Sequence, residues 1–286
     1  MWISDMWEAL QLEFIRNAIT AGLLVSLVCG VIGTLVVVNR IVFLAGGIAH
    51  AAYGGIGLAF FMGWPYLAGT LGFSLCSTGV MAAVTLKAKH RADAMVGIIW
   101  AVGMAVGVIL LDLTPGYNAD LMSYLFGSIL AAPASDLWQM GLMAIVVIAI
   151  VAYYYHDFLA MSYDDEFARL RRVPVTFLYF LLLGMIAMTV VMIIRVVGLI
   201  LVIALLTIPP FIAEKFTGSL RAMMVLSSIL SGLFTLTGLW LSYLFNLTSG
   251  ATIILVAAVG FFAAVLWGRF KPRHPGNASV SAGEPA

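Results

Sequence analysis

The chain has 286 residues, of which 63% are hydrophobic and only 9% are charged, and its mean hydropathy is +1.11. These values exclude an ordinary soluble domain, because a soluble fold needs a largely polar surface. The net charge of +1 gives no indication of nucleic-acid binding. The two cysteines, Cys29 and Cys76, lie in apolar stretches and form neither a disulfide framework nor a CxxC metal motif. Composition therefore indicates a polytopic membrane protein.

Apolar runs of about 20 residues, long enough to cross a hydrocarbon core of about 30 Å as a helix, recur along the chain. They lack the period-two alternation of barrel strands, which favours an all-α fold. Charged residues, prolines and glycines divide them into about nine predicted spans: 14–38, 41–63, 65–86, 93–112, 136–155, 174–193, 196–213, 219–245 and 249–268. We expect an interfacial segment over 1–13, a transmembrane domain over 14–268 and a disordered tail over 269–286.

Basic residues are distributed unequally between the two sides of this predicted topology. Threading the spans alternately leaves only Arg16 and Arg195 on one side. The other side receives the remaining twelve of the 14 Lys and Arg residues: Arg40, Lys87, Lys89, Arg91, Arg169, Arg171, Arg172, Lys215, Arg221, Arg269, Lys271 and Arg273. Because basic residues are retained in the cytoplasm, we predict an external amino terminus and a cytoplasmic carboxyl terminus.

Two connections are longer than a simple turn. The external one, 113–136, is predicted to hold a short helix at the membrane mouth, and the internal one, 156–174, an amphipathic helix that ends at Pro174. Oxygen-bearing side chains gather near the external connection: Asp112, Tyr117, Asn118, Asp120 and Asp136. They would either attract cations to an external mouth by their summed field or serve as ordinary solvated loop residues.

The stretch GGIAHAAYGGIGLAF, residues 46–60, places one histidine among glycines inside a predicted span. His50 lies ten residues after Arg40, about 15 Å along a helix and therefore close to the bilayer midplane. Gly46, Gly54 and Gly57 share its face, which would let another backbone approach closely. An imidazole at this depth must face the protein interior or a water-filled path. It is either a metal ligand or a structural residue that bonds a neighbouring helix.

A proline pair marks the seventh predicted span. Pro209 and Pro210 each lack an N–H group and clash with the preceding turn, so we expect the helix to bend or stop there. The polar insertion AEKFTGSLR follows, in which Gly218 permits a tight reversal. This elbow is either a plain turn between helices or a docking site for a cytoplasmic partner.

Five stretches in order resemble the permease subunit of the zinc/manganese-type ABC importers: RIVFLAGGIAHAAYGGIGLAF, DLMSYLFGSIL, SYDDEFARLRRVPV, VGLILVIALLTIPPFIAEKF and GLWLSYLFNLTSGATIIL. They cover residues 40 to 255. The chain departs from the family at two places. The family often has FLGDALSH where this chain has FLAGGIAH, so Gly46 stands in place of an aspartate, and Glu214 and Lys215 occupy a place where an arginine is common.

The resemblance implies a fold like that of the cobalamin importer (type II) and a homodimeric pore in the cytoplasmic membrane of a prokaryote. It implies a separate cytoplasmic ATPase that binds the ATP, and an external binding protein that delivers a divalent metal, zinc first and manganese or iron as alternatives. His50 would be a transient ligand between two copies of the second span, and Asp112 and Asp120 would lie at the external mouth. The coupling helix that contacts the ATPase would comprise Glu214, Lys215, Phe216, Thr217, Gly218, Ser219, Leu220 and Arg221.

Other functions remain as alternatives. An enzyme is disfavoured because the sequence has no HExxH or GxSxG motif and no paired membrane aspartates, and the absence of GxxxxGK[ST] excludes a P-loop. A permease for an organic metal complex such as cobalamin or haem would need a wider pore. A secondary metal-ion transporter would show matched broken helices in two repeats, whereas only one proline-broken span is evident.

Overall fold

The computed structural model of the chain describes residues 11–87, 91–115, 127, 129 and 132–270. Within these ranges all regular structure is helical, and nine helices are long and apolar enough to cross a membrane, which confirms the predicted class and number of spans. These helices are α2 (Glu13–Val38), α3 (Val42–Met62), α4 (Tyr66–Lys87), α5 (Ala92–Asp112), α7 (Ala134–Tyr153), α10 (Val175–Val197), α11 (Leu199–Phe216), α12 (Leu220–Phe245) and α13 (Ser249–Phe270). The expected interfacial segment and tail lie almost entirely outside the described residues.

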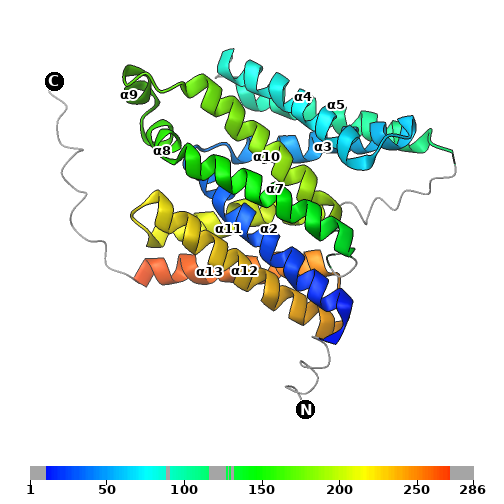
Figure 1. Cartoon of the computed structure of the whole chain (residues 1–286). Coiled ribbons are helices and arrows are strands. Elements are labelled where there is room, and N and C mark those ends of the chain that lie inside the picture. The colour runs from blue at the N-terminus through cyan, green and yellow to red at the C-terminus, as the bar shows by residue number, and fades with distance from the viewer. Residues whose placement is uncertain (1–10, 88–90, 116–126, 128, 130–131, 271–286) are drawn as a thin grey trace.

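The helix ends gather at two opposite sides of the molecule (Figure 1). One side holds the α2–α3 corner, the α11–α12 elbow, the end of α13 and two short helices, α8 (Tyr155–Tyr163) and α9 (Asp165–Leu170). We call it the basic side, because the described residues Arg40, Lys87, Arg171 and Lys215 belong to these helix ends and corners. The arrangement agrees with nine alternating spans.

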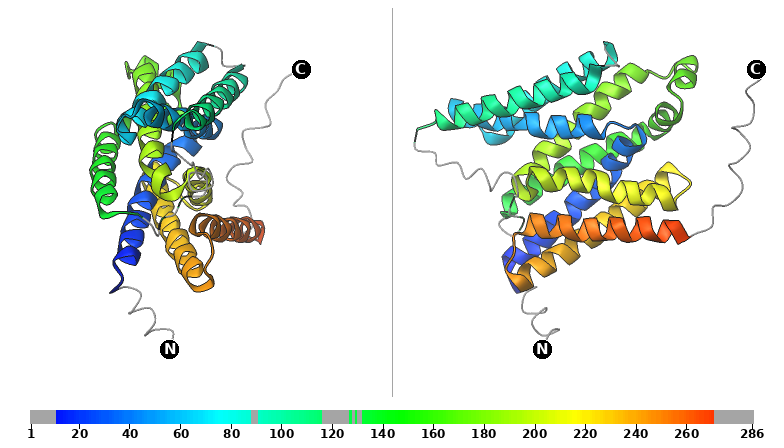
Figure 2. Two further views of the ribbon diagram at one scale, coloured as in Figure 1. Left: turned by 90° about the vertical axis from the view of Figure 1, so that its right-hand side faces the viewer. Right: turned by 180° about the vertical axis from the view of Figure 1, so that it is seen from behind.

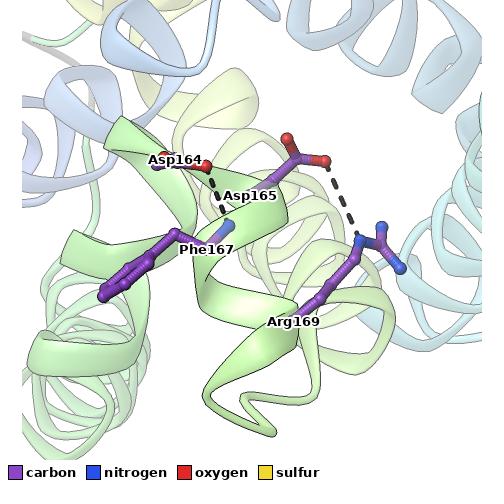
Figure 3. A network of polar contacts seen from close by, with 4 residues as sticks. All are labelled: Asp164, Asp165, Phe167 and Arg169. Carbon is purple, nitrogen blue, oxygen red and sulfur yellow. Dashed lines mark hydrogen bonds and ion pairs between the residues drawn. The ribbon is translucent and has the colours of Figure 1, made fainter.

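The connection predicted as one amphipathic helix over 156–174 forms α8 and α9 instead. Asp164 separates them, because its backbone is extended, with φ −154° and ψ 98°. Its carboxylate accepts a hydrogen bond of 2.9 Å from the backbone N–H of Phe167 and so caps the start of α9 (Figure 3). The expectation of one continuous helix was therefore wrong, and the capping aspartate is the physical reason.

The helix contacts follow a repeated scheme. In the first half α3 packs on α4 and α5, and in the second half α11 packs on α12 and α13; likewise α4 packs on α10 as α12 packs on α2. This scheme pairs α2–α5 with α10–α13, which run in opposite directions across the membrane and so form an inverted repeat. The repeat is hidden in the sequence, because equivalent seams use different residues: Gly22 meets Thr235 where α2 and α12 touch, and Gly184 meets Leu75 where α10 and α4 touch.

Helix α3, which carries His50, is among the most enclosed spans, with 78% of an 18-residue stretch buried. Gly54 and Gly57 lie against the backbone of Gly103 and Gly107 in α5, so closely that a Cβ atom at Gly57 would overlap the Gly107 carbonyl. Gly54 and Gly57 therefore pack on a neighbouring backbone, as expected of them. Gly46 does not, since an added Cβ there would meet only Ile203, at 4.0 Å.

The partner of the glycine face is the chain's own α5, and this changes one expectation. A second copy of α3 cannot occupy the face that α5 already fills, so two α3 helices do not meet along the whole glycine strip. The two ends of α3 remain open to another surface: the part around Gly46 on the basic side, and the opposite end, where Phe61 and Met62 are exposed.

Helix α11 continues through Pro209 and Pro210 to Phe216, so the helix does not stop there. Proline at 210 removes the N–H group that would bond the carbonyl of Leu206. Gly33 of α2 packs on this carbonyl, and a Cβ atom at Gly33 would lie 2.5 Å from its oxygen. Tertiary packing by α2 therefore supports the helix where proline weakens it.

The glycine contact between α3 and α5 gives a direct prediction. We expect Gly57→Ala to destabilise the protein by about 1–3 kcal/mol, because the new methyl group has no space and the helices must separate. Gly72→Ala in α4 is the matched control, since nothing lies within 4 Å of its Cβ position. Thermal unfolding of both variants in detergent measures the difference, and equal midpoints would contradict the packing role.

Candidate functional site

His50 lies in α3, one helical turn after Gly46, and its side chain is partly exposed. Its ring stacks on Trp100 of α5, with ring centroids 4.0 Å apart and an interplanar angle of 36°. Trp100 is held in turn by Phe43, at 6.2 Å between centroids, and by a 3.1 Å contact from its Nε1–H to the sulfur of Met104. The aromatic wall restricts the imidazole to one orientation. Trp100 could not be predicted as a neighbour of His50 from the sequence, because only the packing of α5 on α3 brings the two rings together.

The hydrogen bonding of His50 assigns different roles to its two ring nitrogens. Nδ1 lies 2.8 Å from the carbonyl oxygen of Gly46, one turn earlier on the same helix. A carbonyl can only accept, so Nδ1 carries the proton of this bond, and in the neutral ring Nε2 keeps its lone pair. Metal-binding histidines commonly have this arrangement, in which one nitrogen donates to a carbonyl and the other faces the ion. The alternative staple to a neighbouring helix is not what is seen, since the bond is within α3.

His50 lies on α3 beside two other helices. Trp100 of α5 stacks on its ring, and Ile203 of α11 faces Gly46, one turn earlier on α3. Two helical turns from His50, Phe43 of α3 lines a large cavity on the basic side, together with Thr207 of α11. The end of α3 nearest the basic side therefore borders that cavity.

The cavity, which we call the vestibule, has a volume of about 1770 Å³ and is bounded by the basic-side ends of most helices. Its lining includes four acidic side chains and two basic ones: Asp164, Asp165, Glu166, Glu214, Arg40 and Arg169. Arg169 Nε lies 3.9 Å from Asp165 Oδ2, an exposed pair that leaves a net negative mouth (Figure 3). Such a mouth favours cations over anions.

Two surfaces beside the vestibule project from the basic side. Helix α9 extends beyond the neighbouring spans (Figures 1 and 2) and exposes 54% of Phe167 and 82% of Leu170. Exposed apolar side chains among charged ones are typical of a protein contact. This surface could have been predicted from the sequence, because both apolar residues interrupt the charged run DDEFARLRR. The sequence resemblance placed the partner contact on the elbow instead.

The elbow is the second surface, and its geometry corrects the prediction. Residues 214–221 form no helix of their own: they are the last turn of α11, a turn over 217–219 and the start of α12. Phe216 is 45% exposed, whereas Leu220 is 1% exposed and belongs to the core. Leu220 therefore cannot contact a partner directly.

Three cation–π contacts hold the elbow, and two of them reach neighbouring helices. Lys215 Nζ lies 5.0 Å from the Phe211 ring and 5.9 Å from the Phe261 ring of α13. The Arg221 guanidinium lies 4.5 Å from the ring of Tyr155, the first residue of α8. Each such contact is worth about 0.5–1 kcal/mol at an exposed site. The elbow is thus linked to α13 on one flank and to α8 on the other.

The expected external cluster is not assembled by the part of the chain that the structure covers. Asp112 is exposed at the end of α5, and Asp136 is 7% exposed in the first turn of α7. Tyr117, Asn118, Asp120 and the helix expected near them lie outside the described residues. Among the described residues no group of three His, Cys, Asp or Glu side chains could hold a metal. His50 is therefore the ligand candidate with a defined geometry.

Known proteins are similar to the chain over almost its whole length. The model of the ABC 3 transport family matches residues 11–268. An uncharacterized membrane protein of Synechocystis is 49% identical, covering 93% of this chain and 95% of its own. The manganese transport system membrane protein MntC of Listeria monocytogenes is 33% identical, with 93% of each covered. The structure of PsaBC from Streptococcus pneumoniae in complex with Fab superposes with a TM-score of 0.84 at 27% identity, covering 92% of this chain and 95% of that one.

Proposed function

The chain belongs to the ABC 3 transport family, and we propose that it forms the membrane pathway of an ATP-driven importer for a divalent metal ion. As a permease it is a transport subunit and not an enzyme. The observation that carries the proposal is the imidazole of His50, whose Nδ1 is bound to Gly46 and whose Nε2 is left for a ligand, on a helix whose basic-side end lines an acid-rich vestibule. Manganese is the first candidate, because the Listeria relative is named for it, and it replaces the zinc expected from the sequence.

A second copy of the chain would complete the site. A single imidazole is a weak site for a divalent ion, and two copies facing each other would supply two. Helices α5 and α13 leave surface for such a pairing, because only 22% and 28% of their 18-residue apolar stretches are buried within one chain. A site of few ligands suits a transporter, since a closed four-ligand site would retain the ion.

The ATPase would dock on the basic side, against α9 and the elbow. Phe167 and Leu170 of α9 and Phe216 of the elbow offer apolar anchors, and Arg171 and Glu166 offer charges around them. Among the three anchors Leu170 is the most exposed. We therefore place the larger share of the docking energy on α9 and a smaller share on the elbow, whereas the sequence resemblance had placed it on the elbow alone.

The alternatives are weaker on structural grounds. An organic metal complex would find space in the vestibule. Among the described residues, however, no cavity of comparable size adjoins His50, whose ring is covered by Trp100. The inverted repeat is shared with secondary transporters, so it does not separate the two classes. Family membership over residues 11–268 favours ATP-driven transport.

The metal-ligand role of His50 predicts a specific loss. We expect His50→Ala to fold and assemble, because the change removes bulk at a partly exposed position, but to lower manganese uptake about 10-fold or more in proteoliposomes with the ATPase and binding protein. His50→Gln serves as the second variant. Undiminished uptake per assembled complex in both variants would refute the role.

Gly46→Asp tests the same site by gain instead of loss. The Cβ position at Gly46 meets only Ile203 Cδ1, at 4.0 Å, so the carboxylate has space. One helical turn from His50 it would supply a second ligand, and we expect manganese affinity to rise about 10-fold or more. Isothermal titration measures the change, with Gly72→Asp as the control. Equal affinity in Gly46→Asp and wild type would place the metal elsewhere.

Docking on α9 predicts that two charge substitutions reduce ATPase binding to different extents. Leu170→Asp should reduce co-purification of the ATPase at least about 10-fold, because an exposed apolar anchor is replaced by an unpaired charge, and Phe216→Asp should reduce it less. Tyr153→Asp, also exposed but lying at the end of α7, is the control. Retention of the ATPase by Leu170→Asp would contradict the assignment.

The orientation is testable by labelling from each side. In a Cys76→Ser background, Trp64→Cys in the α3–α4 connection and Leu170→Cys on α9 provide exposed thiols at opposite sides. We expect an impermeant maleimide to label the first in intact cells and the second only in inside-out vesicles, because the basic side is cytoplasmic. Labelling of both thiols from one side would disprove the topology.

A further inference from the structure

One long-range hydrogen bond joins α8 to the α2–α3 corner, from which the helix that carries His50 starts. The Asn39 amide Nδ2 donates to Ser162 Oγ at 2.9 Å and to the carbonyl of Leu35 at 2.8 Å. Both protons of the amide are then used, so the side chain has one orientation. Asn39 lies at the α2–α3 corner, and Ser162 lies near the end of α8, 123 residues later.

The corner that Asn39 occupies joins α2 to α3. Arg40, the next residue, has a left-handed φ of +58°, and two backbone bonds hold it as a regular helix cap: its N–H donates to the carbonyl of Val37 and the N–H of Ile41 to that of Val36, each at 3.0 Å. Helix α3 starts two residues later, at Val42. The Ser162 bond fastens α8 to the side chain of the cap residue Asn39, so a displacement of α8 acts on the corner from which α3 leaves.

Helix α8 is well placed to move this bond. A single residue, Asp164, joins it to α9, its Phe158 is fully buried, and its first residue, Tyr155, contacts Arg221 of the elbow. Both surfaces assigned to the ATPase thus meet in α8. The bond between Ser162 and Asn39 joins α8 to the residue that caps α2, three residues before α3 begins.

We propose that Asn39 is a positioning residue that transmits displacement of α8 and α9 to α3, and through α3 to the metal ligand His50. The inference rests on the proposed function. When the ATPase moves α9, Ser162 moves with α8 and shifts or releases Asn39, and the corner at Arg40 changes the direction of α3. His50, two turns beyond Phe43 at the vestibule wall, then changes its distance to the ion.

The test measures how many ATP molecules are hydrolysed per manganese ion taken up, in proteoliposomes that contain the whole complex. Ser162→Ala and Asn39→Ala should each raise this ratio about fivefold or more. ATPase co-purification should not change, because neither residue belongs to the exposed docking surface. Ser162→Thr keeps the hydroxyl and should keep the ratio. Thr20→Ala removes a hydroxyl that bonds only its own helix, to Arg16, and is the matched control.

The double variant separates transmission from local damage. If the two residues act through one bond, Asn39→Ala with Ser162→Ala raises the ratio no further than either alone, whereas independent effects multiply. An unchanged ratio in both single variants, or multiplication in the double variant, would overturn the inference. Ser162→Ala removes one hydroxyl and leaves the Leu35 bond intact, so a folded protein is available for the test. Failure of the wild-type complex to take up manganese would instead overturn the proposed function and the inference together.

Discussion

The close backbone contact between α3 and α5 determines where the site lies. Gly54 and Gly57 meet Gly103 and Gly107 with no room for a side chain, which holds α3 inside the chain. Membrane helices associate by van der Waals packing of small residues, because lipid gives no hydrophobic drive between them. As a result, α3 cannot present its glycine face to another chain, and the partly exposed titratable residue that it carries is His50.

The same contact gives His50 its chemistry. Packing of α5 on α3 brings Trp100 onto one face of the imidazole, and the carbonyl of Gly46 takes up Nδ1. Gly46 stands where the sequence resemblance leads us to expect an aspartate, so the backbone carbonyl orients the ring and no carboxylate lies at this position beside it. In the proposed importer, passage of an ion would therefore depend more on the pairing of two chains.

Much of the architecture could be predicted from the sequence. Nine spans, the helical class and the side of the basic residues follow from apolar runs and charges, which act locally. The continuation of α11 through Pro209 and Pro210 could not be predicted, because it depends on Gly33 of a distant helix. The break at Asp164 was visible in principle as a capping aspartate. The inverted repeat, the wall at Trp100 and the core position of Leu220 are set by tertiary packing, which no local pattern in one sequence encodes.

In the proposed importer, a short physical path would link metal passage to energy supply. Helices α8 and α9, the α2–α3 corner and the start of α3 all border the vestibule, so a displacement at the basic side need not cross the membrane to reach His50. The short path is consistent with a chain whose described residues include no soluble domain and whose apolar segments form the nine spans.

The central claim, that Nε2 of His50 ligates the transported ion, is tested most directly by pulsed EPR of Mn²⁺ bound to the assembled transporter. The account predicts a nitrogen hyperfine coupling from a directly bound imidazole, and its loss in His50→Ala. A manganese spectrum without that coupling in the wild type, or with the coupling retained in His50→Ala, would contradict it.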